Sequence, residues 1–192
     1  FNGIKNLEEL VPNTDNLFQN LARVEYDLTH IEKKLNWNQV AEIMLEEKQA
    51  LTVVNTKDDA KELYSILSKK PETVYHLSTY MCSAHRKIIL NEVKEKLDNN
   101  KSCYLISTQL IEAGVDIDFP LVLRAMAPLD SIVQAAGRCN RENKLDKGKV
   151  IVFTPQKNKL PTGIYKTATD KSKLFLNDPA QLLTAEIFLD YF

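Results

Sequence analysis

The sequence predicts an α/β fold with a mostly parallel β-sheet flanked by helices on both faces, followed by a helical C-terminal extension. Short apolar, β-branched runs alternate with helical patterns through the middle of the chain. Such connections are right-handed crossovers, which place helices over both faces of a parallel sheet. With 192 residues, of which 44% are hydrophobic, the chain is also long enough to bury a sizeable core.

The expected elements follow one another along the chain. Thr56 is expected to cap a helix that carries Asp58 and Asp59 in its first turn, where carboxylates oppose the helix dipole. The predicted helices are residues 36–47, residues 57–70, a helix capped by Ser83 and ended by residues 98–100, and residues 130–141. The predicted strands are residues 50–55, 73–78, 103–107, 121–126 and 149–155, with residues 23–28 as a further candidate.

Composition and charge exclude several classes of protein. The formal net charge is −1, so there is no broad basic surface and any phosphate contact must be local. The three cysteines form no CxxC pair, which is typical of reduced thiols, and we expect a cytoplasmic protein. No apolar run has the length of a membrane span, and no membrane partner is expected. Because the chain starts at Phe1, we expect a fragment of a longer protein.

The segment QAAGRCNRE, residues 134–142, carries the first candidate site. As a continuous helix it would hold Gly137 in its middle, where glycine costs roughly 0.5 to 1 kcal/mol relative to alanine. Gln134, Arg138 and Arg141 would then share one narrow stripe, opposite an apolar face. The pattern predicts a helix that presents two guanidinium groups to a ligand.

The loop after residues 103–107 carries the second candidate site. Ser107 and Thr108 combine hydroxyls with backbone N–H groups, which suits a phosphate. Gly114 permits a positive φ or the close approach of a ligand, and Asp116 is a short acceptor beside it. Taken alone, this loop reads as a plain turn. Because it and the arginine segment lie on successive crossover loops, we expect both at the same edge of the sheet.

Together, residues 107–142 closely resemble motifs V and VI of superfamily 2 helicases. The sequence STQLIEAGVDID followed by QAAGRCNRE is most similar to that of the CRISPR-associated helicase-nuclease of type I systems. Residues 51–64 are similar to motif IV, and residues 76–86 to the segment after it. The resemblance implies a RecA-like C-terminal lobe over residues 49–155. Residues 1–48 would be its N-terminal edge or a linker from the first lobe, and residues 156–192 a helical extension.

The resemblance also implies a role for each candidate residue. In such motors two RecA-like lobes close on ATP, and Arg138 and Arg141 would be the arginine fingers that reach the γ-phosphate. The residues that would bind or orient the nucleotide are Gln134, Gly114 and Asp116. Gly137 would let the helix approach the opposing lobe. The residues that would grip phosphates of single-stranded DNA are Asn55, Thr56, Ser107 and Thr108.

Two motifs of a complete motor are missing from the sequence. It contains no G-x-x-x-x-G-K-[ST] loop and no D-E-x-[HD] run, so ATP and Mg²⁺ would be bound mainly by the first lobe, upstream of Phe1. The chain alone is therefore expected to hydrolyse no ATP. The implied partners are single-stranded DNA, the first lobe and nuclease domain of the same protein, and the type I CRISPR surveillance complex. The implied function is the unwinding of target DNA for degradation in antiviral defence.

Several alternatives stay open at the level of sequence. The arginine stripe could be a solvated helix face, and His76, Cys82 and His85 lack the fourth ligand of a zinc site. Glu112, Asp116 and Asp118 read better as loop acids than as metal ligands. Trp37 and the tyrosines at 26, 64, 75 and 80 could stack on bases, but strand and helix aromatics are more often core. Another superfamily 2 helicase, acting on RNA or DNA, and a non-catalytic RecA-like binding module are the competing functions.

Overall fold

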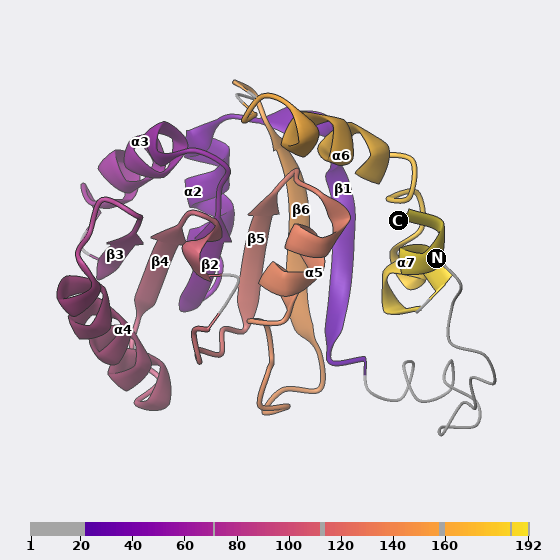
Figure 1. The fold of residues 1–192 in the computed structure, drawn as a ribbon. Helices are drawn as coiled ribbons and strands as arrows, with labels where there is room; N and C mark the ends of the chain where they lie inside the picture. The colour runs from indigo at the N-terminus through magenta and orange to yellow at the C-terminus, as the bar shows by residue number, and fades with distance from the viewer. Residues whose placement is uncertain (1–21, 71, 112–113, 158–159, 185, 192) are drawn as a thin grey trace.

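A single parallel sheet organises the molecule. The computed structural model describes residues 22–70, 72–111, 114–157, 160–184 and 186–191. In these residues, six parallel strands lie in the order β1-β6-β5-β2-β4-β3 (Figure 1). They are β1 (Val24–Leu35), β2 (Gln49–Val53), β3 (Val74–Leu77), β4 (Cys103–Ser107), β5 (Leu121–Ala125) and β6 (Gly148–Pro155). The predicted fold class is confirmed.

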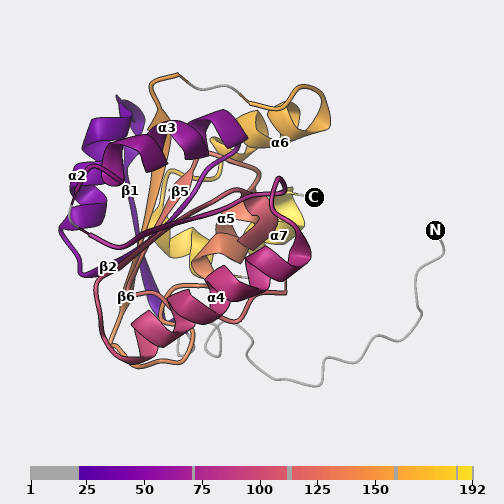
Figure 2. The same cartoon turned by 90° about the vertical axis from the view of Figure 1, so that its left-hand side faces the viewer.

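Helices cover both faces of the sheet. They are α2 (Trp37–Leu45), α3 (Lys57–Leu67), α4 (Ser83–Asp98), α5 (Leu129–Ala136), α6 (Ile164–Ser172) and α7 (Glu186–Tyr191), with 3₁₀ turns η1 (Gln109–Ile111) and η2 (Pro179–Leu183). Helices α2 and α3 lie on one face, and α4 and α5 lie on the other (Figure 2). Each face therefore buries its own layer of apolar side chains.

Strand β5 shows why the central strands are continuous apolar runs. All five of its residues are buried, because the sheet is covered on both sides. Leu121 and Leu123 pack with Trp37 and Leu63 of the α2 and α3 layer. Val122 packs instead with the α4 and α5 layer. Successive side chains of a strand thus serve opposite cores.

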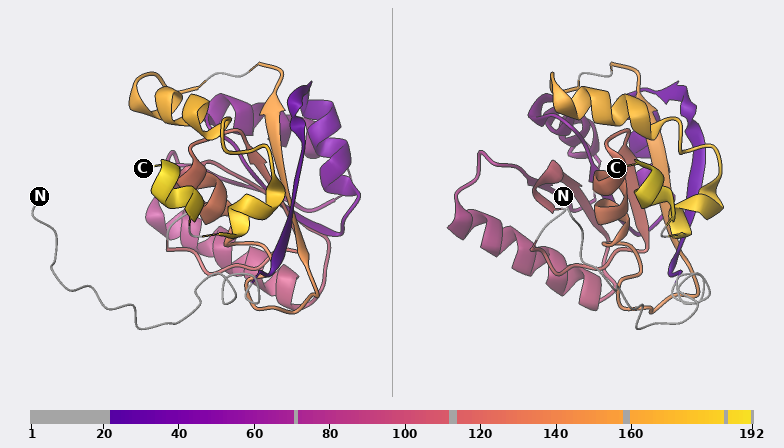
Figure 3. Two further views of the ribbon diagram at one scale, coloured as in Figure 1. Left: turned by 90° about the vertical axis from the view of Figure 1, so that its right-hand side faces the viewer. Right: turned by 45° about the vertical axis from the view of Figure 1, so that its right-hand side comes forward.

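Both ends of the described chain are built onto this sheet. The candidate strand at residues 23–28 is confirmed and extends to Leu35 as edge strand β1, which pairs with β6. The predicted helix at 36–47 is confirmed as α2. Beyond Pro155, η2 and α7 bury Leu182, Ile187 and Tyr191 against the layer that contains α5 (Figure 3). Residues 1–21 lie outside the described residues.

Two predicted helix boundaries are wrong. The helix predicted over 130–141 ends at Ala136, and Gly137 is its C-cap with φ −63°. Gly137 is therefore not in a helix interior, so the cost of glycine that was expected for a continuous helix does not apply to it. Helix α4 begins at Ser83, so Cys82 and not Ser83 is the N-cap residue. The Ser83 hydroxyl instead accepts a hydrogen bond from Arg86 at 3.1 Å.

Candidate functional site

The loop after β4 is divided between the two ends of the strands. Thr108 follows the carboxyl end of β4, as Thr56 follows that of β2. Arg138 lies instead beside the amino end of β5, where Phe119 forms a β-bridge with Cys139. Asp116 of the same loop does reach Arg141, but the expectation that this loop and the arginine segment share one edge is wrong for Ser107 and Thr108. Its physical cause is helix α5, which starts at the carboxyl end of β5 and carries the chain back across the sheet before the arginines are reached.

The arginine segment changes from helix to strand-like pairing within a few residues. After α5 ends, the Arg138 and Cys139 amides donate to carbonyls three residues back, those of Ala135 and Ala136. The Arg138 carbonyl then accepts the Phe119 amide at 2.9 Å, and the Asn140 amide donates to the Phe119 carbonyl at 3.0 Å. The backbone that carries the arginines is thus fixed to the loop in front of β5. Cys139 is buried there, and burial raises the pKa of its thiol to about 12.

Asn140 and Gly148 hold this segment in place, and neither is among the residues that the sequence pattern predicts. Asn140 has φ +46° and is 1% exposed. Its side-chain amide donates to the carbonyls of Arg23 and Leu145, at 2.9 and 2.8 Å. A Cβ added at Gly148 would lie 2.6 Å from the Cys139 sulfur, so only glycine fits there without a shift. The available signal was asparagine, which tolerates the left-handed region better than most residues.

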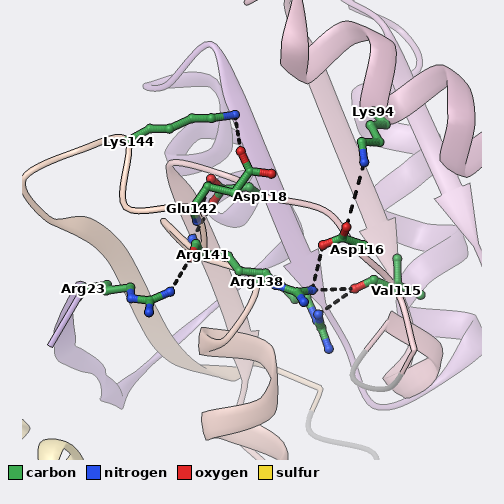
Figure 4. A network of polar contacts seen from close by, with 9 residues as sticks. All are labelled: Arg23, Lys94, Val115, Asp116, Asp118, Arg138, Arg141, Glu142 and Lys144. Carbon is green, nitrogen blue, oxygen red and sulfur yellow. Dashed lines mark hydrogen bonds and ion pairs between the residues drawn. The ribbon is translucent and has the colours of Figure 1, made fainter. Parts of the chain in front are cut away.

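Arg138 and Arg141 converge on a single backbone oxygen. The Val115 carbonyl accepts a hydrogen bond from Arg138 Nη1 at 2.6 Å and another from Arg141 Nη1 at 3.3 Å (Figure 4). Arg141 Nη1 also lies 3.0 Å from Asp116 Oδ1. The structure therefore brings together three of the residues that the sequence singled out, although they do not share a helix face.

The loop before β5 clamps the arginine segment from one side. The Asp118 carboxylate accepts the backbone amides of Arg141 at 2.7 Å and Glu142 at 3.2 Å. From α4, Lys94 Nζ lies 3.9 Å from Asp116 Oδ2. From the start of β1, Arg23 donates a hydrogen bond to the Arg141 carbonyl. Asp118 thus acts on the backbone, whereas Asp116 acts on a guanidinium group.

The local electrostatics favour an anion at this site. Burial, followed by the nearby Arg141 charge, lowers the pKa of Arg138, and Asp116 acts in the opposite direction. Arginine stays protonated despite such a shift, so two positive groups remain close together. The side chain of Asp116 is 68% exposed, which weakens its compensating attraction. A phosphate group would relieve the repulsion between the two guanidinium groups.

The other residues that the resemblance assigned to the nucleotide or the opposing lobe make fewer contacts than the arginines. Gln134 is exposed on the last turn of α5. Gly114 has φ +71°, so backbone conformation explains this glycine, and a Cβ there would meet no atom within 4 Å. Gly137 is exposed and has an ordinary helical φ. A Cβ added at Gly137 would lie 3.3 Å from the Gln134 carbonyl oxygen, a close contact that favours glycine at this position.

Polar side chains at the opposite edge are largely used within the lobe. The Asn55 side chain donates to the Met126 carbonyl at 2.8 Å and accepts from Arg124 and Tyr165 at 2.9 Å each. Thr56 Oγ1 accepts the Asp59 amide at 3.1 Å, which confirms its role as N-cap of α3. The Ser107 hydroxyl, fully buried, donates to the Thr108 carbonyl. Thr108 is 7% exposed.

Neither a metal cluster nor a membrane span is found in the described part of the chain. No three His, Cys, Asp or Glu residues there are arranged to hold a metal ion. None of its helices is both long and apolar enough to cross a membrane. Glu112, one of the loop acids considered from the sequence, lies outside the described residues.

The chain is similar to known proteins in its sequence and in its structure. Residues 46–144 match the sequence model of "CRISPR-associated nuclease/helicase Cas3, C-terminal". A Cas3 of Methanothermobacter thermautotrophicus is 34% identical over 134 residues, which is 68% of this chain and 16% of that protein. A Cas3 of Haloferax volcanii is 51% identical over 69 residues, or 34% of this chain and 7% of that protein.

Solved structures show the same fold at lower sequence identity. The crystal structure of T. fusca Cas3 with AMPPNP gives a TM-score of 0.71 at 18% identity, covering 88% of this chain and 23% of that one. The ADP form gives 0.67 at 20% identity, covering 88% and 24%. These likenesses identify the six-stranded sheet and its helices as a RecA-like fold.

The matches cover much of this chain but only a small part of each relative. The chain spans less than a fifth of the length of the two curated relatives described, so it corresponds to one part of a larger architecture. The family model covers just over half of the 192 residues, including both candidate sites. The chain therefore belongs to the CRISPR-associated nuclease/helicase Cas3 family, as a C-terminal RecA-like lobe.

Proposed function

We propose that this chain is the second RecA-like lobe of an ATP-dependent translocase that unwinds target DNA for degradation in type I CRISPR interference. The observation that carries the proposal is the convergence of Arg138 and Arg141 on the Val115 carbonyl. Two positively charged guanidinium groups, held side by side by a backbone carbonyl at the end of the strands, are suited to bind a polyphosphate that a second lobe presents.

Arg138 and Arg141 would act in catalysis as arginine fingers. A planar guanidinium group donates two hydrogen bonds to phosphate oxygens and stabilises the charge that develops there during phosphoryl transfer. Asp116 holds Arg141 in place at 3.0 Å until a phosphate competes for it. Gln134 and the turn at Gly114 would face the nucleotide, while the first lobe would bind most of the ATP and its Mg²⁺. Gly137 would allow that lobe to approach.

DNA would run along the opposite edge of the sheet. Thr108 would offer its hydroxyl to a backbone phosphate, which suits a translocase because phosphate contacts carry no sequence information. The Thr56 hydroxyl already donates to Asp59 Oδ2 at 2.6 Å, so Thr56 would contribute to the DNA edge by fixing the start of α3. Asn55 and Ser107 would hold the adjacent backbone in place, since both side chains form hydrogen bonds within the lobe.

Related structures support the same assignment because they contain nucleotides or a CRISPR surveillance complex. T. fusca Cas3 has been crystallised with ATP, ADP and AMPPNP. A CRISPR RNA-guided surveillance complex before nicking contains a chain that resembles this lobe, with a TM-score of 0.63 at 20% identity. We infer that ATP, single-stranded DNA and a surveillance complex are partners of the motor to which this chain belongs.

Removal of either arginine finger tests the proposal. In the intact helicase, Arg138→Ala or Arg141→Ala should lower the kcat for ATP hydrolysis by a large factor, up to about 10³-fold. Arg→Lys should not restore the rate, because lysine has no planar fork. Arg86→Ala on α4 is the matched control, since its guanidinium bonds to the Ser83 hydroxyl on the same helix. Normal hydrolysis in both arginine variants would show that the pair is only a solvated surface.

The isolated chain provides a second test. Without a phosphate-binding loop it should hydrolyse no ATP, and sustained activity of the purified 192-residue chain would contradict the assignment as half of a motor. A clear preference of the intact protein for RNA over DNA would favour an RNA helicase instead.

A further inference from the structure

Tyr80 departs from the expectation that the aromatic residues belong to the core. Trp37 is 6% exposed and Tyr26 is 7% exposed, as a core position requires, whereas Tyr80 is 80% exposed. It lies in the loop between β3 and α4. At that exposure, folding removes little of the apolar surface of the ring from water. Packing within the described chain therefore does not explain the position of Tyr80.

Lys57 fixes the orientation of this ring from another element. Its ammonium group lies 3.6 Å from the centroid of the Tyr80 ring. Lys57 is the first residue of α3, so the contact joins the segment after β2 to the segment after β3. An ammonium ion covers only a small part of one face, and with 80% of the residue exposed the other face is open.

The pair bridges the carboxyl end of β4, which lies between β2 and β3. Val53 of β2 and Leu77 of β3 both pair with Ser107 of β4, so the three strands end in line. The Thr108 amide donates to the Leu77 carbonyl at 3.3 Å. Lys57 and Tyr80 therefore belong to the segments that follow the two strands flanking β4, at the edge where the proposed function places DNA.

We propose that Tyr80, oriented by Lys57, is a stacking platform for one base of single-stranded DNA. The inference rests on the proposed function and adds a contact to the bases, where the hydroxyl residues would contact only phosphates. Stacking on an aromatic face suits a translocase because every base has such a face. Lys57 adds a positive charge close to the phosphate of the stacked nucleotide, in a chain whose net charge is −1.

The chemistry of the surroundings favours a nucleic acid over a protein partner. A protein interface would need a contiguous apolar patch around the ring. The immediate neighbours of Tyr80 in sequence are Thr79 and Met81, of which Met81 packs against the core, and Lys57 lies over the ring from across the edge. One ring with a cation and hydroxyl neighbours matches a stacked base beside a phosphate.

A fluorescent base tests stacking directly. The probe is a single-stranded oligonucleotide with 2-aminopurine, whose emission is quenched by stacking, titrated with the 192-residue chain at fixed salt. Tyr80→Ala should weaken binding about fivefold or more and reduce the quenching, whereas Tyr80→Phe should bind and quench like the parent chain. Tyr64→Ala, at a tyrosine that is 38% exposed on α3, is the matched control and should leave both readouts unchanged.

The outcomes separate the two proposals. Binding and quenching that survive Tyr80→Ala would overturn the stacking inference and leave the DNA-translocase assignment intact. If the parent chain fails to bind the oligonucleotide at any concentration, both the platform and the proposed DNA edge are wrong. Lys57→Gln gives an independent readout, since it should weaken binding and make the dependence of affinity on salt less steep.

Discussion

At the scale of single residues, a buried arginine joins the C-terminal extension to the centre of the sheet. Arg124 of β5 is fully buried and donates to the Asn55 side chain at 2.9 Å and to the Tyr165 hydroxyl at 3.2 Å. The Tyr165 hydroxyl donates in turn to Asn55 Oδ1 at 2.9 Å. Three side chains from β5, the end of β2 and α6 thus form a closed set of hydrogen bonds.

Removal of the Tyr165 hydroxyl should therefore destabilise the lobe. Tyr165→Phe deletes one bond to a charged group and one to a buried amide, and we expect the free energy of unfolding to fall by roughly 1.5 to 3 kcal/mol. Urea denaturation of the 192-residue chain measures it. Tyr80→Phe removes the same atom from an exposed ring and should unfold at the parent midpoint. Equal midpoints for all three proteins would show that the set contributes nothing to stability.

The sequence singled out residues that the structure brings together, but not the contacts between them. Arg138, Arg141 and Asp116 were chosen because a long motif surrounds them. The Val115 carbonyl, which accepts hydrogen bonds from both arginines, could not be predicted, because a backbone oxygen leaves no trace in the residue type. The engagement of Asn55 by Arg124 was also hidden, because it joins residues 69 positions apart.

At the scale of elements, strand β3 carries a titratable group with an acid-sensitive environment. Burial lowers the pKa of His76, whose Nε2 has no hydrogen-bond partner among the residues that the structure describes. Its ring lies 6.0 Å from that of Tyr64 on α3. Protonation of His76 is thus harder in the folded lobe than in the unfolded chain.

The direction of the pH dependence follows from this shift. The folded pKa is below the unfolded value of about 6.5, so the unfolded state binds the proton more readily and stability falls as the pH drops below about 6.5. The free energy of unfolding, measured from pH 7.5 to pH 5.5, should decline in the parent chain. The decline should be smaller in His76→Gln. His85→Gln, at an exposed position of α4, is the control and should keep the parent slope.

The end of α5 shows where prediction of elements fails. The segment after Ala136 keeps a helical pattern, with Cys139 on the apolar face, and Gly137 is the one local signal that the helix ends there. The helix ends because Arg138 and Asn140 pair with Phe119, about twenty residues earlier in the chain. Such a partner is known only once the chain has folded back on itself.

At the scale of the whole molecule, the fold class could be predicted but the strand order could not. Alternating patterns identify strands and helices locally. The insertion of β2 between β5 and β4 depends on the packing of both faces at once. The arginines and Thr108 lie at opposite ends of the strands because α5 carries the chain back across the sheet, and the sequence pattern does not show where along that return the arginines lie.

Affinity for DNA should reflect the weak overall charge. With a net charge of −1, the 192-residue chain should bind single-stranded DNA weakly, without sequence preference, and less as salt rises. In the intact helicase, Thr108→Ala should remove the stimulation of ATP hydrolysis by DNA while ATP binding survives, because Arg138 and Arg141 remain. Fluorescence anisotropy and DNA-stimulated ATPase rates measure the two effects. Unchanged stimulation in Thr108→Ala would assign this loop to the fold alone.

The separation of the arginine pair from the hydroxyl edge gives the lobe the geometry of a lever. Strand β5 has five residues, so the two sites stand about 17 Å apart along the sheet. In the proposed motor, gain or loss of a phosphate would pivot the lobe about the arginines, and the far edge would sweep an arc in proportion to that arm. A stiff sheet with two packed faces would transmit the swing without bending. The length of the strands would then set the stroke along the DNA.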